Sequence, residues 1–493
     1  MIIRFCSVPN RSYAALLALS LGLVAADTWQ AGANKKAAAA DPLVAQATDA
    51  IVQAADTFAK SASIHGGYVY QVTLDGQQRF GEGLATETEA WVQPPGTPTV
   101  GLALLRGYQA TGNARLLKHA TAAADALIHG QLQSGAWTDR VDFNPKGKSV
   151  GPYRNGKGNK KGRNYSTLDD DKSQAAIRFL IEMDQVHDRQ HVAIHEAVSY
   201  ALESLLKAQF ANGGFPQGWQ KPVETYPLAR ASYPTYDWRT EGRIKEYWDY
   251  ETLNDGLAGT VTATLWLAFE AYDDQRYKQA MLNFGDFLIA SQMPEPQPGW
   301  AQQYNHSLIP IWARKFEPPA IAGVESEDVL RTLMFIAEKT GERRFLTPIP
   351  AAIEWLRRSR LPNGQIARFY ELQTNTPLYF VKDTYELTYD DSNLPTHYGF
   401  KSDTKIDKIE QRYQTLLKDN ASQEKPASLK SLRRDAETVL SNLDSQARWV
   451  TTKDRKPVVK TSPSDNAALF LDSAVFSANL TRLSAYVVAA RKD

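Results

Sequence analysis

The stretch TVTATLWLAFEAYDDQRYKQAMLNFGDFLIASQM, residues 260–293, decides the fold class. Its apolar residues recur three or four positions apart on both sides of a turn at Asp273 and Asp274. This spacing places them on one face of each of two amphipathic helices. The stretch therefore predicts a helical hairpin whose apolar faces pack into a core.

The same pattern occurs three more times along the chain. Each copy has two segments with helical periodicity joined by a short turn that contains Gly or Asp. Clear strands are almost absent from the sequence pattern, and repeated hairpins are typical of helical repeat architectures. The further copies cover residues 100–132, 174–210 and 329–361.

A loop with an aromatic residue follows each hairpin. Trp137, Trp219 and Trp300 stand at intervals of 82 and 81 residues, which is about the length of two helices and two connections. In NGGFPQGW, residues 212–219, a left-handed helix end and a proline predict an abrupt stop of the helix. Loops at equivalent ends of hairpins gather on one side, where a binding groove can form.

These features predict an all-α fold. We expect an α/α toroid, or incomplete α/α barrel, of repeated helical hairpins with long loops forming a groove at one end. An open superhelical stack of the same hairpins is the alternative.

The N-terminal residues have the pattern of a secretory signal peptide. Arg4 and Arg11 precede an apolar run at 14–26, which is too short to span a bilayer well. The only cysteine, Cys6, lies in this segment, so the mature chain has no disulfide and no cysteine metal ligand. We expect a secreted or periplasmic monomer with no membrane contact after cleavage, although a retained anchor is the alternative. The expected parts are a signal peptide at 1–26, a flexible segment at 27–40, and a single α/α-toroid catalytic domain at 41–493, with C-terminal helices in 403–493.

Charge is balanced overall but uneven locally. With 56 basic and 55 acidic residues and no recognisable motif, the chain has no feature of a nucleic-acid-binding protein. Residues 145–163, PKGKSVGPYRNGKGNKKGR, hold seven basic residues and no acid. Such a stretch is commonly a solvated loop, but beside a groove it would attract an acidic polymer.

Carboxylates cluster before two of the hairpins. Asp169, Asp170 and Asp171 precede the second hairpin and repel one another unless a cation or a helix N-terminus is near. They suit calcium, which prefers oxygen ligands, and capping of the helix by solvated acids is the alternative. Asn254 and Asp255 occupy the same position before the third hairpin, so the two loops can face one another.

Two arginines stand in similar surroundings, Arg314 in WARKFE and Arg368 in ARFYE. Each can be a packed structural residue, but a guanidinium is also well shaped to bind a carboxylate through two hydrogen bonds. Together with the acids and the aromatic residues, the arginines indicate an acidic saccharide ligand.

Six stretches resemble, in the same order, pectate lyases of polysaccharide lyase family 10. They are PPGTPTVGLALLRGYQATGN, TLDDDKSQAAIRFL, QFANGGFPQGW, ETLNDGLAGTV, WARKFEPPAIAGVES and ARFYELQTNTPLYF, within residues 45–400. The resemblance implies calcium-dependent β-elimination of α-1,4-linked polygalacturonate to 4,5-unsaturated oligogalacturonates. A base removes the C5 proton, the glycosidic oxygen leaves from C4, and calcium and arginine stabilise the enediolate-like state.

The resemblance also implies roles for individual residues. Arg314 matches the proposed base, although the pKa of an arginine is ordinarily above about 12. Arg368 matches the arginine that holds a substrate carboxylate, and Asp169 and Asp255 match the calcium-side aspartates. Further candidate substrate-binding residues are Asn254 and Trp219.

The chain departs from the family at three places. Gly256 stands where relatives have an acid, TNTP at 374–377 replaces TNRP, and residues 227–247 form an insert. The missing acid leaves a non-catalytic binder as one alternative. A glycoside hydrolase that uses Asp169 and Asp255 as its carboxylate pair is the other. A magnesium-diphosphate site for prenyl transfer is excluded by the expected export.

Overall fold

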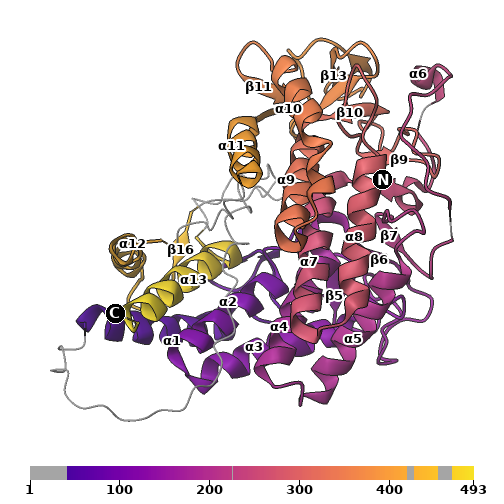
Figure 1. The fold of residues 1–493 in the computed structure, drawn as a ribbon. Coiled ribbons are helices and arrows are strands. Elements are labelled where there is room, and N and C mark those ends of the chain that lie inside the picture. Colours follow the sequence, from indigo (N-terminus) through magenta and orange to yellow (C-terminus); the bar gives the residue numbers. More distant parts are fainter. Residues whose placement is uncertain (1–40, 225, 242, 419–426, 453–468, 493) are drawn as a thin grey trace.

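The computed structural model describes residues 41–492 except 225, 242, 419–426 and 453–468 (Figure 1). The predicted signal peptide at 1–26 and the flexible segment at 27–40 lie outside the described residues. In the part of the chain that is described, no helix is long and apolar enough to cross a membrane.

The fold is predominantly helical, and its helices are paired as the periodicity predicts (Figure 1). Each of the four predicted hairpins is present, with ends shifted by a few residues. In the fourth pair a short 3-10 helix, η4 (Arg343–Leu346), precedes the second helix, where prolines remove backbone donors. The pairs are α2 (Thr97–Thr111) with α3 (Ala114–Gly130), α4 (Lys172–Val186) with α5 (Val192–Lys207), α7 (Leu257–Tyr272) with α8 (Gln275–Ala290), and α9 (Gly323–Thr340) with α10 (Ile349–Arg358).

Left-handed residues end the first helix of three pairs. Gly112, Asp273 and Gly341 have φ of 71°, 54° and 75°, and each donates its backbone N–H to the carbonyl four residues earlier. Asn113 and Asp274 then begin the next helix by accepting a backbone N–H with their side chains. These turns explain why the second helix begins after only two residues in the pairs α2/α3 and α7/α8.

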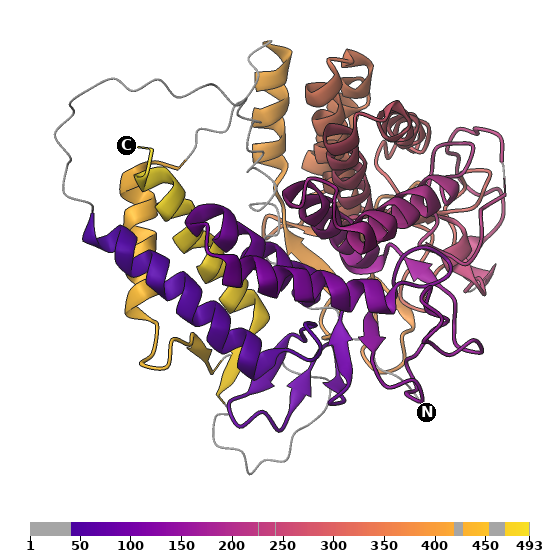
Figure 2. The ribbon, with the colours of Figure 1, turned by 90° about the horizontal axis from the view of Figure 1, so that it is seen from below.

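The two ends of the described chain form a fifth pair, which the sequence does not reveal. Helix α13 (Ser473–Ala490) packs against both α1 (Pro42–Ala62) and α2 (Figure 2). Strand β17 (Phe470–Asp472) precedes α13 and pairs with β1 (Gln71–Thr73), which follows α1. The Gln71 amide donates to Asp472 at 2.9 Å across 401 positions of sequence, a distance that local periodicity cannot bridge.

Short strands close the four hairpins, so the helical fold that the sequence predicts also contains strands that the sequence does not predict. The strand before the first helix of each pair is antiparallel to a strand after the second helix. Strands of two or three residues are too short to show an alternating pattern in sequence. The closing pairs are β4 (Glu89–Trp91) with β5 (Arg140–Asp142), β6 (Ser166–Thr167) with β7 (Gly218–Trp219), β8 (Glu251–Thr252) with β9 (Gln303–Tyr304), and β10 (Ala320–Ala322) with β12 (Phe369–Glu371).

The remaining strands and helices lie outside the four closed hairpins. One sheet has the order β16-β17-β1-β2-β3, and another has the order β10-β12-β13-β14. Outside the pairs lie β2 (Arg79–Phe80), β3 (Leu84–Ala85), α6 (Trp238–Glu241), β11 (Gln365–Ala367), β13 (Pro377–Phe380), β14 (Leu387–Thr388), β15 (Lys401–Asp403), α11 (Ile406–Leu417), α12 (Leu429–Ser441) and β16 (Val450–Thr451).

The first helices of the pairs form one continuous row. In the order α13, α2, α4, α7, α9, each packs against the next, and α1 contacts α3, which contacts α5. Most buried apolar residues in the described part of the chain belong to one cluster, from Ala47 in α1 to Val487 in α13. The hairpins therefore share one core and keep their loop ends in a fixed relation.

A glutamine after the second helix joins neighbouring repeats. Gln131, Gln209 and Gln292 each donate through the side-chain amide to a carbonyl of their own loop and to one in the following repeat, at 2.8 or 2.9 Å. Because each amide bridges the same two places, these three residues fix the structural register of the repeats.

This register corrects the alignment that the tryptophan spacing predicts. The residue six positions after Gln131 is Trp137, and Phe215 stands at the same distance from Gln209. Trp300, eight positions after Gln292, is their counterpart, because Trp137 and Trp300 both donate the indole N–H to a carbonyl of the preceding helix. All three rings are fully buried. Trp219 is therefore not the equivalent of Trp137 and Trp300.

The stretch NGGFPQGW contains a glycine, Gly213, whose replacement is expected to destabilise the fold. Gly213 has φ of 90°, and a β-carbon there would lie 2.1 Å from the backbone oxygen of Asn283 in α8. We expect Gly213→Ala to lower the free energy of unfolding by about 3 kcal/mol, measured by urea denaturation. Gly364 is the matched control, because it has φ of 83° in the corresponding turn with nothing within 4 Å of a β-carbon. An equal cost at both positions would show that the contact with α8 is unimportant.

Candidate active site

Two helix starts with the same backbone conformation bring the predicted acids together. Helix α4 is preceded by η1 (Asp169–Asp171) and α7 by η3 (Asn254–Gly256), and the two turns are in contact. Asp170 and Asp171 have φ of 50° and 61°, and Asp255 and Gly256 have φ of 52° and 72°. Left-handed backbone at residues other than glycine is costly and concentrates at functional sites.

The matching backbone conformation of the two turns identifies the counterpart of Gly256. Asp170 is the counterpart of Asp255, and Asp171 is the counterpart of Gly256. The Asp171 carboxylate accepts two hydrogen bonds from Arg178, at 2.6 and 2.8 Å, and is therefore occupied by that arginine. By this comparison, an acid at position 256 would not face the site.

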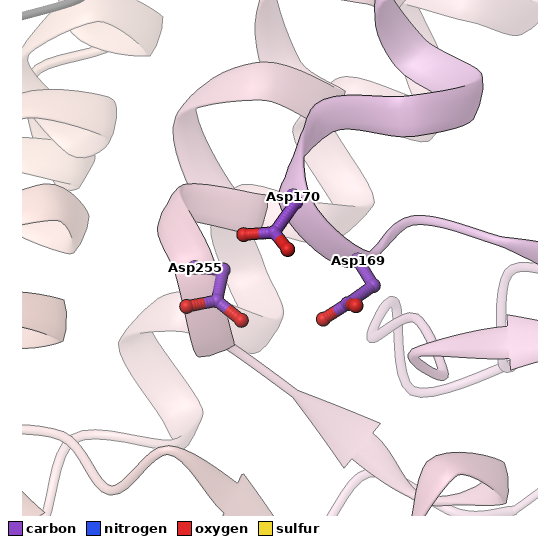
Figure 3. A group of neighbouring side chains, drawn as sticks. All are labelled: Asp169, Asp170 and Asp255. Atoms are coloured by element: carbon purple, nitrogen blue, oxygen red, sulfur yellow. The ribbon is translucent and has the colours of Figure 1, made fainter. Parts of the chain in front are cut away.

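Asp169, Asp170 and Asp255 form an acidic triad (Figure 3). One carboxylate oxygen from each lies within 4.8 Å of the other two. The sequence prediction named Asp169 and Asp255 as metal ligands, and the structure places them together. Asp170 was considered only as part of the triplet that suits calcium, because the backbone conformation that aims this residue at Asp255 is not visible in the sequence.

Three cations surround the triad. Lys172 Nζ lies 2.7 Å from Asp169 Oδ2 and 3.5 Å from Asp170 Oδ2. Arg314 Nη2 lies 3.4 Å from Asp169 Oδ1, and Arg368 Nη2 lies 3.7 Å from Asp255 Oδ1. The two predicted arginines and the two predicted aspartates therefore meet in one site, and Lys172 is an additional member.

Arg314 is held by groups on several sides. Its backbone N–H donates to Glu317 at 3.1 Å, and its Nε donates to the hydroxyl of Tyr247 at 3.2 Å. Burial alone would lower the pKa of Arg314, but the carboxylates of Glu317, Asp169 and Asp255 outweigh it and raise that pKa well above its ordinary value. In this state Arg314 is a guanidinium cation.

Arg368 lies in a buried network. It donates to Glu325 at 2.8 Å, and its guanidinium carbon stands 4.2 Å from the ring centroid of Tyr398. The Tyr398 hydroxyl donates to Glu317 at 3.0 Å, so the network connects Arg368 with the partner of Arg314. Only 12% of the Arg368 side chain is exposed, which leaves room for a contact from one side.

One position of each repeat reaches the rim of this site. The backbone carbonyls of Asp139, Gln217, Gln302 and Arg368 accept equivalent hydrogen bonds of 2.8 or 2.9 Å from the residue that leads into the first helix of their own pair. Gln217 donates to Asp169 at 2.6 Å, and Gln302 donates to Asn254 at 3.1 Å and to Glu325 at 2.8 Å. The glutamines were missed because the tryptophan alignment set the repeats in the wrong register.

Burial and neighbouring charges shift the pKa values of Asp169 and Asp255 in opposite directions. Burial opposes ionisation of Asp169, but Lys172 and Arg314 outweigh it and lower its pKa below the ordinary value. Burial, Asp170 and Asp169 raise the pKa of Asp255 well above its ordinary value. Because the neighbouring carboxylates disfavour the ionised form of Asp255, a divalent cation bound between them would favour that form.

The donor set fits a hard cation. Calcium binds oxygen at about 2.3–2.6 Å, so two ligand oxygens on opposite sides of the ion lie about 5 Å apart. The 4.8 Å limit within the triad agrees with this geometry. The donors are all carboxylate oxygens, which calcium prefers to nitrogen or sulfur.

Two predicted substrate-binding residues are buried instead. Trp219 is 3% exposed and donates its indole N–H to Ser134 at 2.9 Å, so no ring face is open for stacking on a sugar. Asn254 is 4% exposed, and its side-chain oxygen accepts from Gln302 and from the backbone of Asp255. Neither side chain is open to a ligand in this structure, and a role for either in substrate binding stays a prediction.

The site lies within a stretch that matches a known family. The model of the pectic acid lyase family matches residues 131–403, which is more than half of the chain. The chain belongs to the pectic acid lyase family. The resemblance stated from the sequence is thereby confirmed, and this pectic acid lyase is a polysaccharide-cleaving enzyme rather than a non-catalytic binder or a glycoside hydrolase. The matched residues include the triad, Arg314 and Arg368.

Several solved structures are similar to this pectic acid lyase, whereas no curated protein matches it. A mutant of a family 10 polysaccharide lyase from Cellvibrio cellulosa, in complex with trigalacturonic acid, is 18% identical, with a TM-score of 0.45 over 65% of this chain and 98% of that chain. A second structure of a family 10 polysaccharide lyase from this organism is 20% identical, with a TM-score of 0.45 over 64% and 96%. The α-1,6-mannanase from a Salegentibacter species is 12% identical, with a TM-score of 0.40 over 90% and 99%. The family assignment rests on the family model.

Proposed function

We propose that the enzyme cleaves α-1,4-linked polygalacturonate by calcium-dependent β-elimination at the site around Arg314. The observation that carries this proposal is the convergence of three carboxylates with two partly exposed arginines. Such a site offers a hard-cation position next to guanidinium groups, which is the combination that a uronate carboxylate needs. The product would be a 4,5-unsaturated oligogalacturonate.

The chemistry requires neutralisation of a carboxylate. The C5 proton of galacturonate is weakly acidic because the adjacent carboxylate is already negative. Arg368 is proposed to hold this carboxylate, and Asp170 and Asp255 to hold the calcium, with Asp169 completing the triad. Bound calcium supplies Lewis-acid stabilisation of the enediolate-like state.

Arg314 is proposed to remove the C5 proton. The electron pair of the C5–H bond then forms the double bond between C4 and C5, and the glycosidic bond at C4 breaks. The leaving oxygen keeps the bonding pair and takes a proton from solvent. This role needs the neutral guanidine, whereas Glu317, Asp169 and Asp255 favour the cation in the free enzyme. Asp169 and Asp255 belong to the proposed metal site. Positive charge placed there offsets their part of the support for the arginine proton and lowers the pKa of Arg314.

The finer architecture and setting are proposals of the same kind. The row of hairpins supports an incomplete α/α toroid, and the single apolar cluster supports one catalytic domain at 41–493. We further propose a secreted or periplasmic monomer whose loop ends form the substrate groove.

Removing calcium tests the proposed reaction. We expect the purified enzyme to form ultraviolet-absorbing unsaturated uronate from polygalacturonate, and a chelator to reduce the rate by at least about 100-fold. Added calcium should restore the rate. Cleavage that leaves no double bond, or a rate that is unchanged by the chelator, would contradict the proposal.

A further inference from the structure

The basic loop at 145–163 ends beside the active site with its charges unpaired. Among the described residues, none of its seven basic side chains forms an ion pair. Arg163, the last of them, is exposed, and its guanidinium carbon lies 4.2 Å from the ring centroid of Tyr165 and 5.6 Å from that of Trp248. Three residues after Tyr165, the chain reaches Leu168 and then the triad at Asp169.

The end of the insert also contacts this place. Arg243 is exposed, and its guanidinium carbon lies 5.6 Å from the ring centroid of Tyr247. The Tyr247 ring contacts the half-buried Trp248 ring at 5.2 Å, and the Tyr247 hydroxyl accepts from Arg314. A continuous series of contacts therefore runs from Arg163 through Trp248 and Tyr247 to Arg314.

The insert is attached firmly enough to present these side chains. The backbone N–H of Ile244 donates to the carbonyl of Trp312 at 3.1 Å, two residues before Arg314. Farther back in the insert, Arg239 forms an ion pair with Glu371 in β12. The segment is thus tied to the same repeat boundary that carries the catalytic loop.

We propose that Arg163, Arg243 and Trp248 form a uronate subsite beside Arg314, which binds a sugar unit of the substrate chain outside the bond that is cleaved. The proposal rests on the proposed function for its substrate class. A guanidinium without a carboxylate partner can take a uronate carboxylate through two hydrogen bonds, and an indole face can take the apolar face of a sugar ring.

Two acids lie near the proposed subsite. Asp249 and Glu246 are exposed, and Arg163 lowers the pKa of Asp249, whereas burial and Glu246 raise it. No ion pair joins Asp249 to Arg163 or to Arg243 among the described residues. Both arginines therefore remain available to a carboxylate of the substrate.

Binding of octagalacturonate without calcium tests the subsite independently of turnover. We expect Arg163→Ala, Arg243→Ala and Trp248→Ala each to weaken binding about tenfold, as loss of a charge-assisted hydrogen bond or of a stacked ring does. For the two arginine variants, binding of the fully methyl-esterified octamer should equal that of the wild type, because its esters offer no charge. Thermal unfolding identifies a variant that has lost its fold rather than its subsite.

Arg154→Ala is the matched control, because Arg154 lies in the same loop but stacks 5.2 Å from the ring centroid of Tyr200 in α5. It should bind the octamer as the wild type does. Wild-type affinity in both Arg163→Ala and Arg243→Ala, or no binding by the wild type, would overturn the subsite. If the wild type binds and the variants bind weakly, but no unsaturated product forms with calcium, the subsite stands and the lyase proposal fails.

Discussion

Replacing Arg314 by alanine or by lysine is expected to lower kcat on polygalacturonate by about 1,000-fold, the loss typical of removing a general base. Lysine should not substitute, because its ammonium is a point charge. The planar guanidinium contacts Tyr247, Asp169 and Glu317 at once. Initial rates of unsaturated product formation at saturating substrate and calcium measure the effect. Octagalacturonate binding should remain measurable, because Arg368 and the proposed subsite are intact.

The neighbouring residue provides the control for this experiment. Lys315 is exposed, and its ammonium lies 3.4 Å from the ring centroid of Tyr385, away from the triad partners of Arg314. Lys315→Ala removes one positive charge from the same loop and should keep nearly the wild-type rate. A rate for Arg314→Lys within about tenfold of the wild type would show that charge alone suffices and that no base role is needed.

Periodicity in the sequence predicts those helices whose apolar residues follow one regular spacing. The four hairpins follow from apolar residues three or four apart, because each helix buries one face against the common core. The fifth pair is different, since α1 and α13 lie at opposite ends of the sequence. Their direct packing and the pairing of β1 with β17 show that they form a unit.

The site was predictable in its residue types but not in its geometry. Asp169, Asp255, Arg314 and Arg368 were found because carboxylates and arginines stand in conspicuous motifs. Asp170 depends on a left-handed backbone angle, which aspartate adopts at a cost and which no sequence pattern specifies. The burial of Trp219 could not be predicted from the sequence either, because an aromatic residue in a Gly-rich loop can face either solvent or core.

The triad predicts an order of effects on calcium binding. We expect Asp170→Asn and Asp255→Asn each to weaken calcium affinity about 100-fold, because each removes one of three charges from a site whose affinity depends on ligand charge. Calorimetric titration of the substrate-free enzyme measures this directly. Asp169→Asn should cost less, since Lys172 at 2.7 Å and Gln217 at 2.6 Å already occupy oxygens of that carboxylate.

The Asp171→Asn variant tests whether calcium affinity depends on which carboxylates face the ion or only on the number of acids nearby. Asp171 belongs to the same triplet, but its carboxylate is bound by Arg178, so its replacement should lower the melting temperature and leave calcium affinity unchanged. Arg178 also donates to Thr260 and Thr264, which keeps it anchored in the variant. If Asp171→Asn weakened calcium as much as Asp170→Asn, position 171 would be a ligand. Its counterpart Gly256 would then mark a genuine loss from the metal site, rather than a position that never faced it.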